Sequence, residues 1–266
     1  MATVASRDEI LDSKLLRLAI VEMIYRSKEG HIPSAFSILD ILIALYSSIP
    51  GLSSDFSKHK FVLSKGHGCA ALYVVLASMG ILDWKDIELY GSNGSKLGGH
   101  PDRTKQAGIE ASSGSLGHGF PFAVGLALAE KILKTQDART YVLLGDGECQ
   151  EGTTWEAASV AINQNLNNLI AIIDWNGSSS QLQPKEHLQE KWSAFGWKTL
   201  ELDGHNISQM ISLFEEIHSN PQIQPVVLLA KTTKGKGVSF IEGHGNWHHK
   251  IPNEHELQKI IEELQH

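Results

Sequence analysis

Two short polar segments follow apolar runs of this chain and have the residue types that hold a metal-bound phosphate. Gly145-Asp-Gly147 ends one apolar run, and Asn176 ends another that begins at Leu169. Each run has the length and the bounding residues of a buried strand, and residues 153–165 are expected to form the helix that joins the two strands. Asp146 and Asn176 would then lie side by side at two strand ends.

A carboxylate and a side-chain amide suit a hard cation such as Mg²⁺ or Ca²⁺, which takes oxygen ligands and leaves positions for phosphate oxygens. Gly145 and Gly147 allow the backbone to approach such a phosphate closely. An aspartate here could instead cap a helix, but capping explains Asp146 alone and not Asn176 as well. The pattern therefore predicts a metal-held diphosphate.

The composition excludes several classes of protein. The formal charge of −7 comes without a basic stripe, which argues against nucleic acid as a partner. No run approaches the roughly 20 apolar residues of a membrane span. Two cysteines are too few for a disulfide scaffold, and no basic and apolar leader opens the sequence, so we expect a cytoplasmic protein.

The periodicity predicts an α/β fold, with a mainly parallel sheet covered by helices on both faces. The 42% hydrophobic content is enough for the core of one domain over residues 1–266. A long irregular stretch over residues 91–119 is typical of a functional loop. Besides the elements above, we expect helices over 8–28, 37–46, 70–79, 120–134 and 208–218, and strands over 61–63, 197–202 and 226–230.

Five ordered segments resemble motifs of the transketolase family of thiamine diphosphate enzymes, and the resemblance covers about residues 10–256. It implies the thiamine diphosphate-binding fold, a Mg²⁺ or Ca²⁺ ion, and transfer of a two-carbon ketol unit from a ketose or ketose phosphate to an aldose. The segments are Ser64-Lys-Gly-His-Gly-Cys-Ala70, Gly98-Gly-His-Pro101, Ser113-Gly-Ser-Leu-Gly-His-Gly119, Gly145-Asp-Gly-Glu-Cys-Gln-Glu-Gly152 and Asn246-Trp-His-His249.

Full-length transketolases have a diphosphate-binding, a pyrimidine-binding and a carboxy-terminal domain, and this chain has room only for the first. The resemblance thus implies the amino-terminal subunit of a split transketolase, inactive by itself. Its partner would be a second subunit with the pyrimidine-binding domain, which supplies the activating glutamate, in a heterotetramer of two chains of each kind. The family places Glu151 elsewhere, in a network at the subunit interface.

The resemblance also assigns residues to the site. It makes Asp146, Asn176 and the backbone carbonyl of Ser178 the metal ligands. Cofactor contacts fall on His67, Gly114, Leu116, Gly145, Asp146, Gly147, Glu151, Asn176 and His248. The catalytic positions that line the channel around the diphosphate and the sugar fall on His31, His67, His100 and His248.

The chain departs from the family pattern at several positions. His118 replaces a usual glutamine, which keeps hydrogen bonding and adds a titratable group. His249 stands where glycine is common, and could contact a phosphate or face solvent. Residues 231–237, with three lysines, fit either a phosphate-attracting loop or a solvated strand exit. A zinc site at His244, His248 and His249 is disfavoured, because glycines break any helix that would align them.

Two other functions compete with this interpretation. One is a subunit of another thiamine diphosphate enzyme, such as the α subunit of a 2-oxo acid dehydrogenase or a fragment of a deoxyxylulose-phosphate synthase. His67, His100 and His248 favour sugar chemistry instead. The other is a non-catalytic regulatory partner of a transketolase, which has no physical need for Asp146 and Asn176 together.

Overall fold

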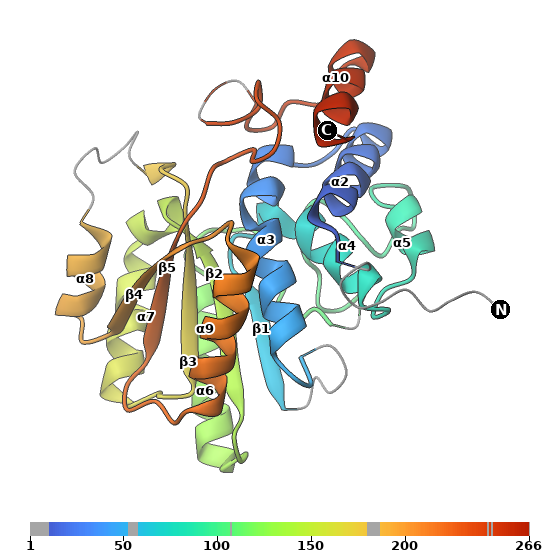
Figure 1. Ribbon diagram of the computed structural model, residues 1–266. Coiled ribbons are helices and arrows are strands. Elements are labelled where there is room, and N and C mark those ends of the chain that lie inside the picture. Colours follow the sequence, from blue (N-terminus) through green and yellow to red (C-terminus); the bar gives the residue numbers. More distant parts are fainter. Residues whose placement is uncertain are drawn as a thin grey trace.

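A five-stranded sheet organises the chain, and the carboxyl ends of its strands meet at one edge. The computed structural model describes residues 11–52, 58–106, 108–179, 187–243, 245 and 247–265. The strands are β1 (His59–Leu63), β2 (Arg139–Gly145), β3 (Leu169–Trp175), β4 (Lys198–Asp203) and β5 (Val226–Lys231). They lie in the order β1-β2-β3-β5-β4, and each neighbouring pair is parallel (Figure 1). The predicted α/β fold with a parallel sheet is confirmed.

Helices connect the strands and cover the sheet. The α-helices are α2 (Ser13–Ser27), α3 (Ile32–Ser48), α4 (Cys69–Ser78), α5 (Trp84–Glu88), α6 (Gly119–Leu133), α7 (Gly152–Asn163), α8 (Leu188–Ala194), α9 (Ile207–Ser219) and α10 (Glu254–Gln265). In the described part of the chain, the 3₁₀ turns η1 (Gly66–Gly68) and η2 (Gly147–Gln150) follow β1 and β2 with at most two residues between. None of the described helices is long and apolar enough to cross a membrane.

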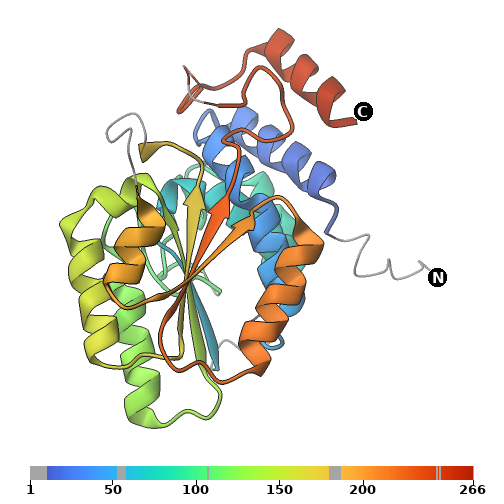
Figure 2. The same cartoon turned by 60° about the vertical axis from the view of Figure 1, so that its left-hand side comes forward.

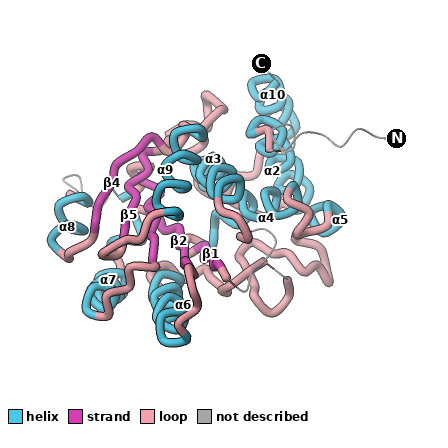
Figure 3. Tube along the Cα trace, turned by 60° about the horizontal axis from the view of Figure 1, so that its bottom comes forward, coloured by secondary structure: helices cyan, strands magenta, loops and turns pink. Residues whose placement is uncertain are grey.

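The strand order explains which helices cover which face. The chain advances across the sheet from β1 to β4 through α6, α7 and α8, and then steps back through α9 to insert β5 beside β3. Because connections between parallel strands are right-handed, a step in the opposite direction places its helix on the opposite face. Accordingly α6, α7 and α8 lie on one face, while α9 lies on the other with α3 (Figure 2). Helices α2 and α4 lie beside α3, and α5 packs on the far side of α4, beyond the β1 edge (Figure 3).

The two faces of the sheet belong to two separate hydrophobic cores. In β2, Tyr141 and Leu143 face the core that includes α3, α4 and α9. Val142 and Leu144 alternate with them and face the core built with α6, α7 and α8. This alternation follows from the two-residue period of a strand. All four side chains are fully buried, so the sheet is held from both sides.

Helix α3 begins earlier than the sequence indicated. We expected a helix over residues 37–46, but α3 begins at Ile32, five residues earlier. Pro33 lies in its first turn, where a missing N–H costs nothing because no partner exists for it within the helix. His31 therefore occupies the N-cap position and lies at a helix end rather than in a loop.

Most other predicted elements are confirmed, with boundaries shifted by a few residues. The first helix was expected over 8–28 and spans Ser13–Ser27, where the Asp12 side chain caps its first turn; residues 8–10 lie outside the described part. Helices α5, α8 and α10 were not predicted from the sequence. Helices α5 and α8 are only 5 and 7 residues long, too short for a helical period to stand out.

A substitution in the sheet tests this packing. Ile173 in β3 is fully buried, and Ile173→Ala is expected to lower the free energy of unfolding by about 2–5 kcal/mol, because it leaves a cavity. Ile223 is 89% exposed, and Ile223→Ala should change it by no more than about 0.5 kcal/mol. Chemical denaturation of both variants makes the comparison. Equal losses would contradict the assignment of Ile173 to the core.

Candidate active site

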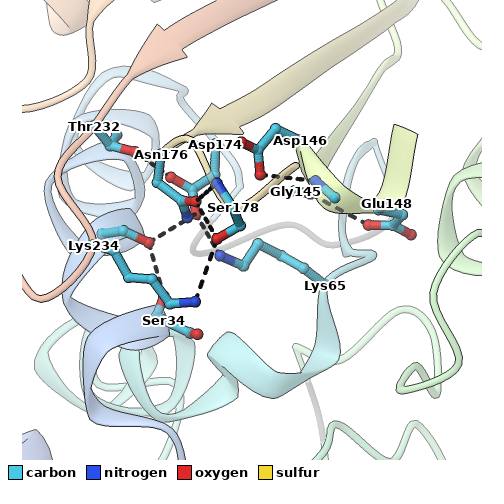
Figure 4. Close-up of polar contacts among 12 residues, drawn as sticks. Ser34, Lys65, Gly145, Asp146, Glu148, Asp174, Asn176, Ser178, Thr232 and Lys234 are labelled. Atoms are coloured by element: carbon cyan, nitrogen blue, oxygen red, sulfur yellow. Dashed lines mark hydrogen bonds and ion pairs between the residues drawn. The ribbon is translucent and has the colours of Figure 1, made fainter. Parts of the chain in front are cut away.

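Polar side chains gather at the carboxyl edge of the sheet, around a cavity of about 120 Å³. Four strands or their following turns contribute, namely those of β1, β2, β3 and β5 (Figure 4). The lining consists of Ser34, Lys65, His67, Leu116, Gly145, Asp146, Gly147, Glu148, Asn176, Ser178, Lys234 and His248. A second cavity, of about 270 Å³, shares Ser178, Lys234 and His248 with it and extends the site toward Trp247.

Asp146 and Asn176 lie side by side, because β2 and β3 are neighbours. The Asp146 amide donates a 3.1 Å hydrogen bond to the carbonyl of Asp174, which joins the two strand ends. The Asp146 carboxylate accepts bonds from the Gly147 amide at 2.7 Å and the Ser179 hydroxyl at 3.1 Å. The Asn176 side-chain oxygen accepts the Ser178 amide at 3.0 Å. The polar ends that sequence analysis expected to meet are thus adjacent.

The surroundings of Asp146 favour a cation. Burial, followed by the negative charge of Asp174, raises the pKa of Asp146. A bound cation would stabilise the ionised form of a carboxylate that is buried near a second carboxylate. The oxygen atoms of Asp146, Asn176 and Ser178 form a donor set that suits a hard divalent cation. Among the described residues, no group of three or more His, Cys, Asp or Glu forms an alternative metal site.

Asp174 is the most connected residue of the site, and sequence analysis did not single it out. The Lys65 ammonium and the Thr232 hydroxyl both bond its carboxylate. The Ser37 hydroxyl adds a bond of 2.7 Å, and the Asn176 amide adds one of 2.9 Å. The signal available in the sequence was an aspartate inside an otherwise apolar strand, which requires a buried partner.

Glu148 joins the β1 and β2 ends to the loop before α6. One carboxylate oxygen accepts the Gly117 amide at 2.9 Å and the Ser64 hydroxyl, and the other accepts the Gly145 amide at 3.3 Å. Burial raises the pKa of Glu148. Gly117 has a φ of +80°, and a Cβ there would lie 2.6 Å from the Cβ of Glu151, so only glycine fits. Glu151 itself is exposed at the start of α7.

The glycines assigned to the cofactor have distinct surroundings. Gly147 lines the cavity, and a Cβ on it would meet no atom within 4 Å, so its backbone faces open space. Gly114 packs against the ring of His100, whose Cδ2 would lie 3.1 Å from a Cβ at that position. Leu116 lines the cavity with its side chain. The cavity therefore leaves the backbone at Gly147 accessible to a phosphate.

Five histidines surround the site, with His31 at their centre. Its ring centroid lies 5.6 Å from that of His67, 6.3 Å from His100 and 5.4 Å from His248. His249 is closer still, at 4.6 Å. The four histidines selected from the sequence thus come together from four separate segments, and His249 joins them. His118 is exposed, and its ring nitrogen contacts the Leu116 carbonyl at 3.1 Å.

The environment keeps the central imidazoles neutral. Burial, followed by the charge of Lys65, lowers the pKa of His67 to about 2. Burial, followed by His249, lowers the pKa of His31 to about 4. Burial and the neighbouring Lys234 also lower the pKa of His248. Neutral rings donate one hydrogen bond and accept another, which suits contacts with sugar hydroxyl groups.

Two lysines near the end of β5 lie in different environments. Lys234 is 9% exposed, and its ammonium lies 3.1 Å from Nδ1 of His248 and 3.3 Å from the Ser178 hydroxyl. Lys231 is exposed and pairs with Glu201 at 2.6 Å. Of the two alternatives for residues 231–237, Lys234 fits the phosphate-attracting one and Lys231 the solvated one. His244 and Asn246, which we named from the sequence, lie outside the described residues.

A family model and individual relatives all match this chain to transketolases. The family described as "Transketolase, thiamine diphosphate binding domain" matches residues 9–265. One subunit of an apulose-4-phosphate transketolase from Phocaeicola vulgatus is 39% identical over 263 residues, which cover 96% of this chain and 92% of that protein. A 6-deoxy-6-sulfo-D-fructose transketolase subunit from a Clostridium species is 36% identical, over 95% of this chain and 94% of its own length.

Complete transketolases match over a smaller share of their length. The human enzyme is 34% identical over 94% of this chain but only 41% of its own length. The solved transketolase structure from Leishmania mexicana superimposes with a TM-score of 0.85 at 27% identity, covering 98% of this chain and 41% of that one. The structure from Campylobacter jejuni gives 0.84 at 28% identity, covering 96% and 42%. The chain therefore belongs to the transketolase family and matches, over nearly its whole length, relatives that are named as transketolase subunits.

Proposed function

We propose that this chain is the diphosphate-binding subunit of a two-subunit transketolase, which transfers a two-carbon ketol unit from a ketose or ketose phosphate to an aldose. The observation that carries the proposal is the meeting of Asp146, Asn176, Ser178 and Lys234 at one cavity. Three oxygen donors for a divalent cation lie beside a lysine ammonium, which suits a diphosphate.

Each part of the cavity has a task in this proposal. Asp146, Asn176 and the Ser178 carbonyl would hold Mg²⁺ or Ca²⁺, and Lys234 would attract the diphosphate charge. The open backbone at Gly147 would contact a phosphate oxygen. When bound, thiamine diphosphate supplies the carbon nucleophile that cleaves the bond between C2 and C3 of the ketose. The chain's own residues bind and orient that group.

The histidines would bind and orient the sugar substrate and the diphosphate. His31 lies at the start of α3, and His100 lies in the irregular stretch over residues 91–119. Both would donate hydrogen bonds to substrate hydroxyl groups and to the carbonyl oxygen as it gains charge. His67 and His248 lie at the cavity and would orient the diphosphate end. A neutral imidazole is a suitable donor here, because it needs no counter-ion in a buried site.

A second polypeptide completes the site in this proposal. The relatives that are named as transketolase subunits support a partner chain, which would carry the pyrimidine-binding domain and the activating glutamate. Glu151, exposed at the start of α7, would lie at the contact between subunits. We propose a heterotetramer of two subunits of each kind, the natural outcome of sites that are formed between chains.

Reconstitution tests the proposal as a whole. The chain with its partner, thiamine diphosphate and Mg²⁺ should transfer a two-carbon unit from a ketose, measured as the new ketose and the released aldose. Neither chain by itself should do so. Release of CO₂ from pyruvate would indicate the 2-oxo acid dehydrogenase alternative, and no transfer from any ketose tested would overturn the proposal.

A matched pair of aspartates tests the metal assignment. Asp137 precedes β2 and Asp146 follows it, so Asp137→Asn alters the opposite end of the same strand. Asp146→Asn should weaken Mg²⁺-dependent binding of thiamine diphosphate to the assembled enzyme by at least about tenfold, because a charged ligand is lost. Asp137→Asn should leave binding unchanged in titration calorimetry. If the chain were instead a non-catalytic regulatory partner, both variants would keep their effect on the transketolase that they regulate.

The histidine environment gives a pH prediction. Below about pH 6.5 the unfolded chain takes up protons at His31 and His67, whereas in the folded chain the pKa values are about 4 and about 2. Protonation thus favours the unfolded chain, and these two groups make the free energy of unfolding fall as pH drops from 6.5 toward 4.

Nuclear magnetic resonance can follow this directly. Ring signals of His31 and His67 should stay at neutral positions from about pH 8 down to about 5, whereas the same residues in the urea-denatured chain should titrate near 6.5. Titration of His67 in the folded chain within this range would show that the ring is not buried as described.

A further inference from the structure

A buried polar cluster lies outside the cavity, between α2, α3 and the turn after β4. Arg17 on α2 and Asp40 on α3 are each 4% exposed. The guanidinium donates two bonds to the carboxylate, of 3.1 and 2.7 Å, so the pair is bidentate. Nδ1 of His205 lies 2.7 Å from the same carboxylate. Nothing in the proposed chemistry uses these three residues.

The hydrogen bonds of His205 define which nitrogen carries its proton. The backbone amide of Thr233 donates a 2.8 Å bond to Nε2 of His205, so Nε2 is an acceptor without a proton. Nδ1 must then carry the proton and donate it to Asp40. One neutral imidazole thereby links a carboxylate that is fixed by Arg17 to the backbone of the loop after β5. The arrangement resembles the carboxylate-histidine pairs that orient ligands in enzyme sites.

The residues on either side of Thr233 belong to the site in different ways: Lys234 lines the cavity, whereas Thr232 bonds Asp174 behind it. Thr232 bonds the Asp174 carboxylate through its hydroxyl, and Lys234 contacts His248 and Ser178 (Figure 4). The Thr233 amide between them bonds His205, which lies outside the cavity lining. A displacement of this amide would therefore move both side chains that the loop contributes to the site.

The glycine before His205 provides independent support for a close fit. The Gly204 amide donates a 2.8 Å bond to the Lys231 carbonyl. A Cβ on Gly204 would lie 2.4 Å from the Cγ2 of Thr232, so the segment tolerates no side chain there. Because the hydroxyl of Thr232 is bonded to Asp174, Thr232 cannot rotate away without loss of that bond. Gly204 and His205 thus bond the chain on both sides of Thr232, at the Lys231 carbonyl and at the Thr233 amide.

We propose that His205 is a positioning residue, which fixes the Thr233 amide and so holds Lys234 at the cofactor cavity and Thr232 against Asp174. His205 does not line that cavity, and it acts on the site through the backbone of the loop. The role of the cavity in binding diphosphate rests on the proposed function, but the role of His205 in holding the loop does not.

Two near-isosteric variants separate the two bonds of the imidazole. His205→Asn keeps a donor near Nδ1 for Asp40 but is too short to reach the Thr233 amide. His205→Gln places an amide oxygen near Nε2, where it can accept from that amide. Hydrogen exchange of residues 231–237, measured on the full chain without cofactor, should be about threefold to tenfold faster in the asparagine variant. It should stay within about twofold of wild type in the glutamine variant.

A control histidine is available at the other end of the sheet. His218 also makes a ring-nitrogen contact, at 3.2 Å with the Tyr141 hydroxyl. His218→Asn should leave exchange of residues 231–237 unchanged. Unchanged exchange in His205→Asn, with a native circular dichroism spectrum, would overturn the proposal. If that variant does not fold, Gly204→Ala, which pushes on Thr232, must accelerate exchange in the same segment for the proposal to stand.

A double-mutant cycle tests whether the effect passes through Lys234. In the enzyme assembled with its partner, His205→Asn should raise the Kd for thiamine diphosphate several-fold. In a Lys234→Met background the same change should have less than about a twofold effect. Equal effects in both backgrounds would show a general structural role and overturn the positioning role. If the wild-type assembly binds no thiamine diphosphate, the proposed function fails, while the exchange result still decides the role of His205.

Discussion

The buried ion pair between Lys65 and Asp174 is the interaction on which the site depends. Their side chains are 2% and 0% exposed, so both charges have lost their water. Such a pair is tolerated only when further hydrogen bonds satisfy it, and Ser37 and Thr232 provide two of them. Removal of one partner would leave an unpaired buried charge, at a cost of about 3–5 kcal/mol. The pair thus ties the β1 end to the β3 end beneath Asp146.

Two buried carboxylates, Asp174 and Glu148, hold different sides of the site in place. Asp174 joins β1, β3, β5 and α3, and so fixes the side where the metal and the diphosphate would lie. Glu148 joins β1, β2 and the loop at Gly117, and so fixes the side of Leu116. Both are carboxylates that accept several donors, which makes them rigid centres in a region of loops. Catalytic groups on loops need rigid support of this kind to keep their geometry.

Local sequence was sufficient for most of the elements and for the metal-binding half of the site. The short apolar runs of β2 and β3 predicted two strands, and a helix between them placed Asp146 beside Asn176. The start of α3 could not be predicted in this way, because Pro33 is compatible both with a break and with a first helical turn. Lys65 and Asp174 were not paired either, since two strand ends must first be placed in order across the sheet.

By itself the sequence determined the α/β class, the parallel sheet, the family resemblance and the list of polar residues that could reach a diphosphate. The class and the sheet follow from periodicity, whereas the resemblance rests on five motif segments, and most of the listed residues are what that resemblance implies. Only the tertiary structure decided which of several lysines face the cavity, that Asp174 joins four side chains, and that His205 holds the loop from outside. The physical reason is that a buried charge or amide needs a hydrogen-bond or ion-pair partner next to it in space. The order of the strands and the side of each crossover bring those partners together from distant parts of the chain.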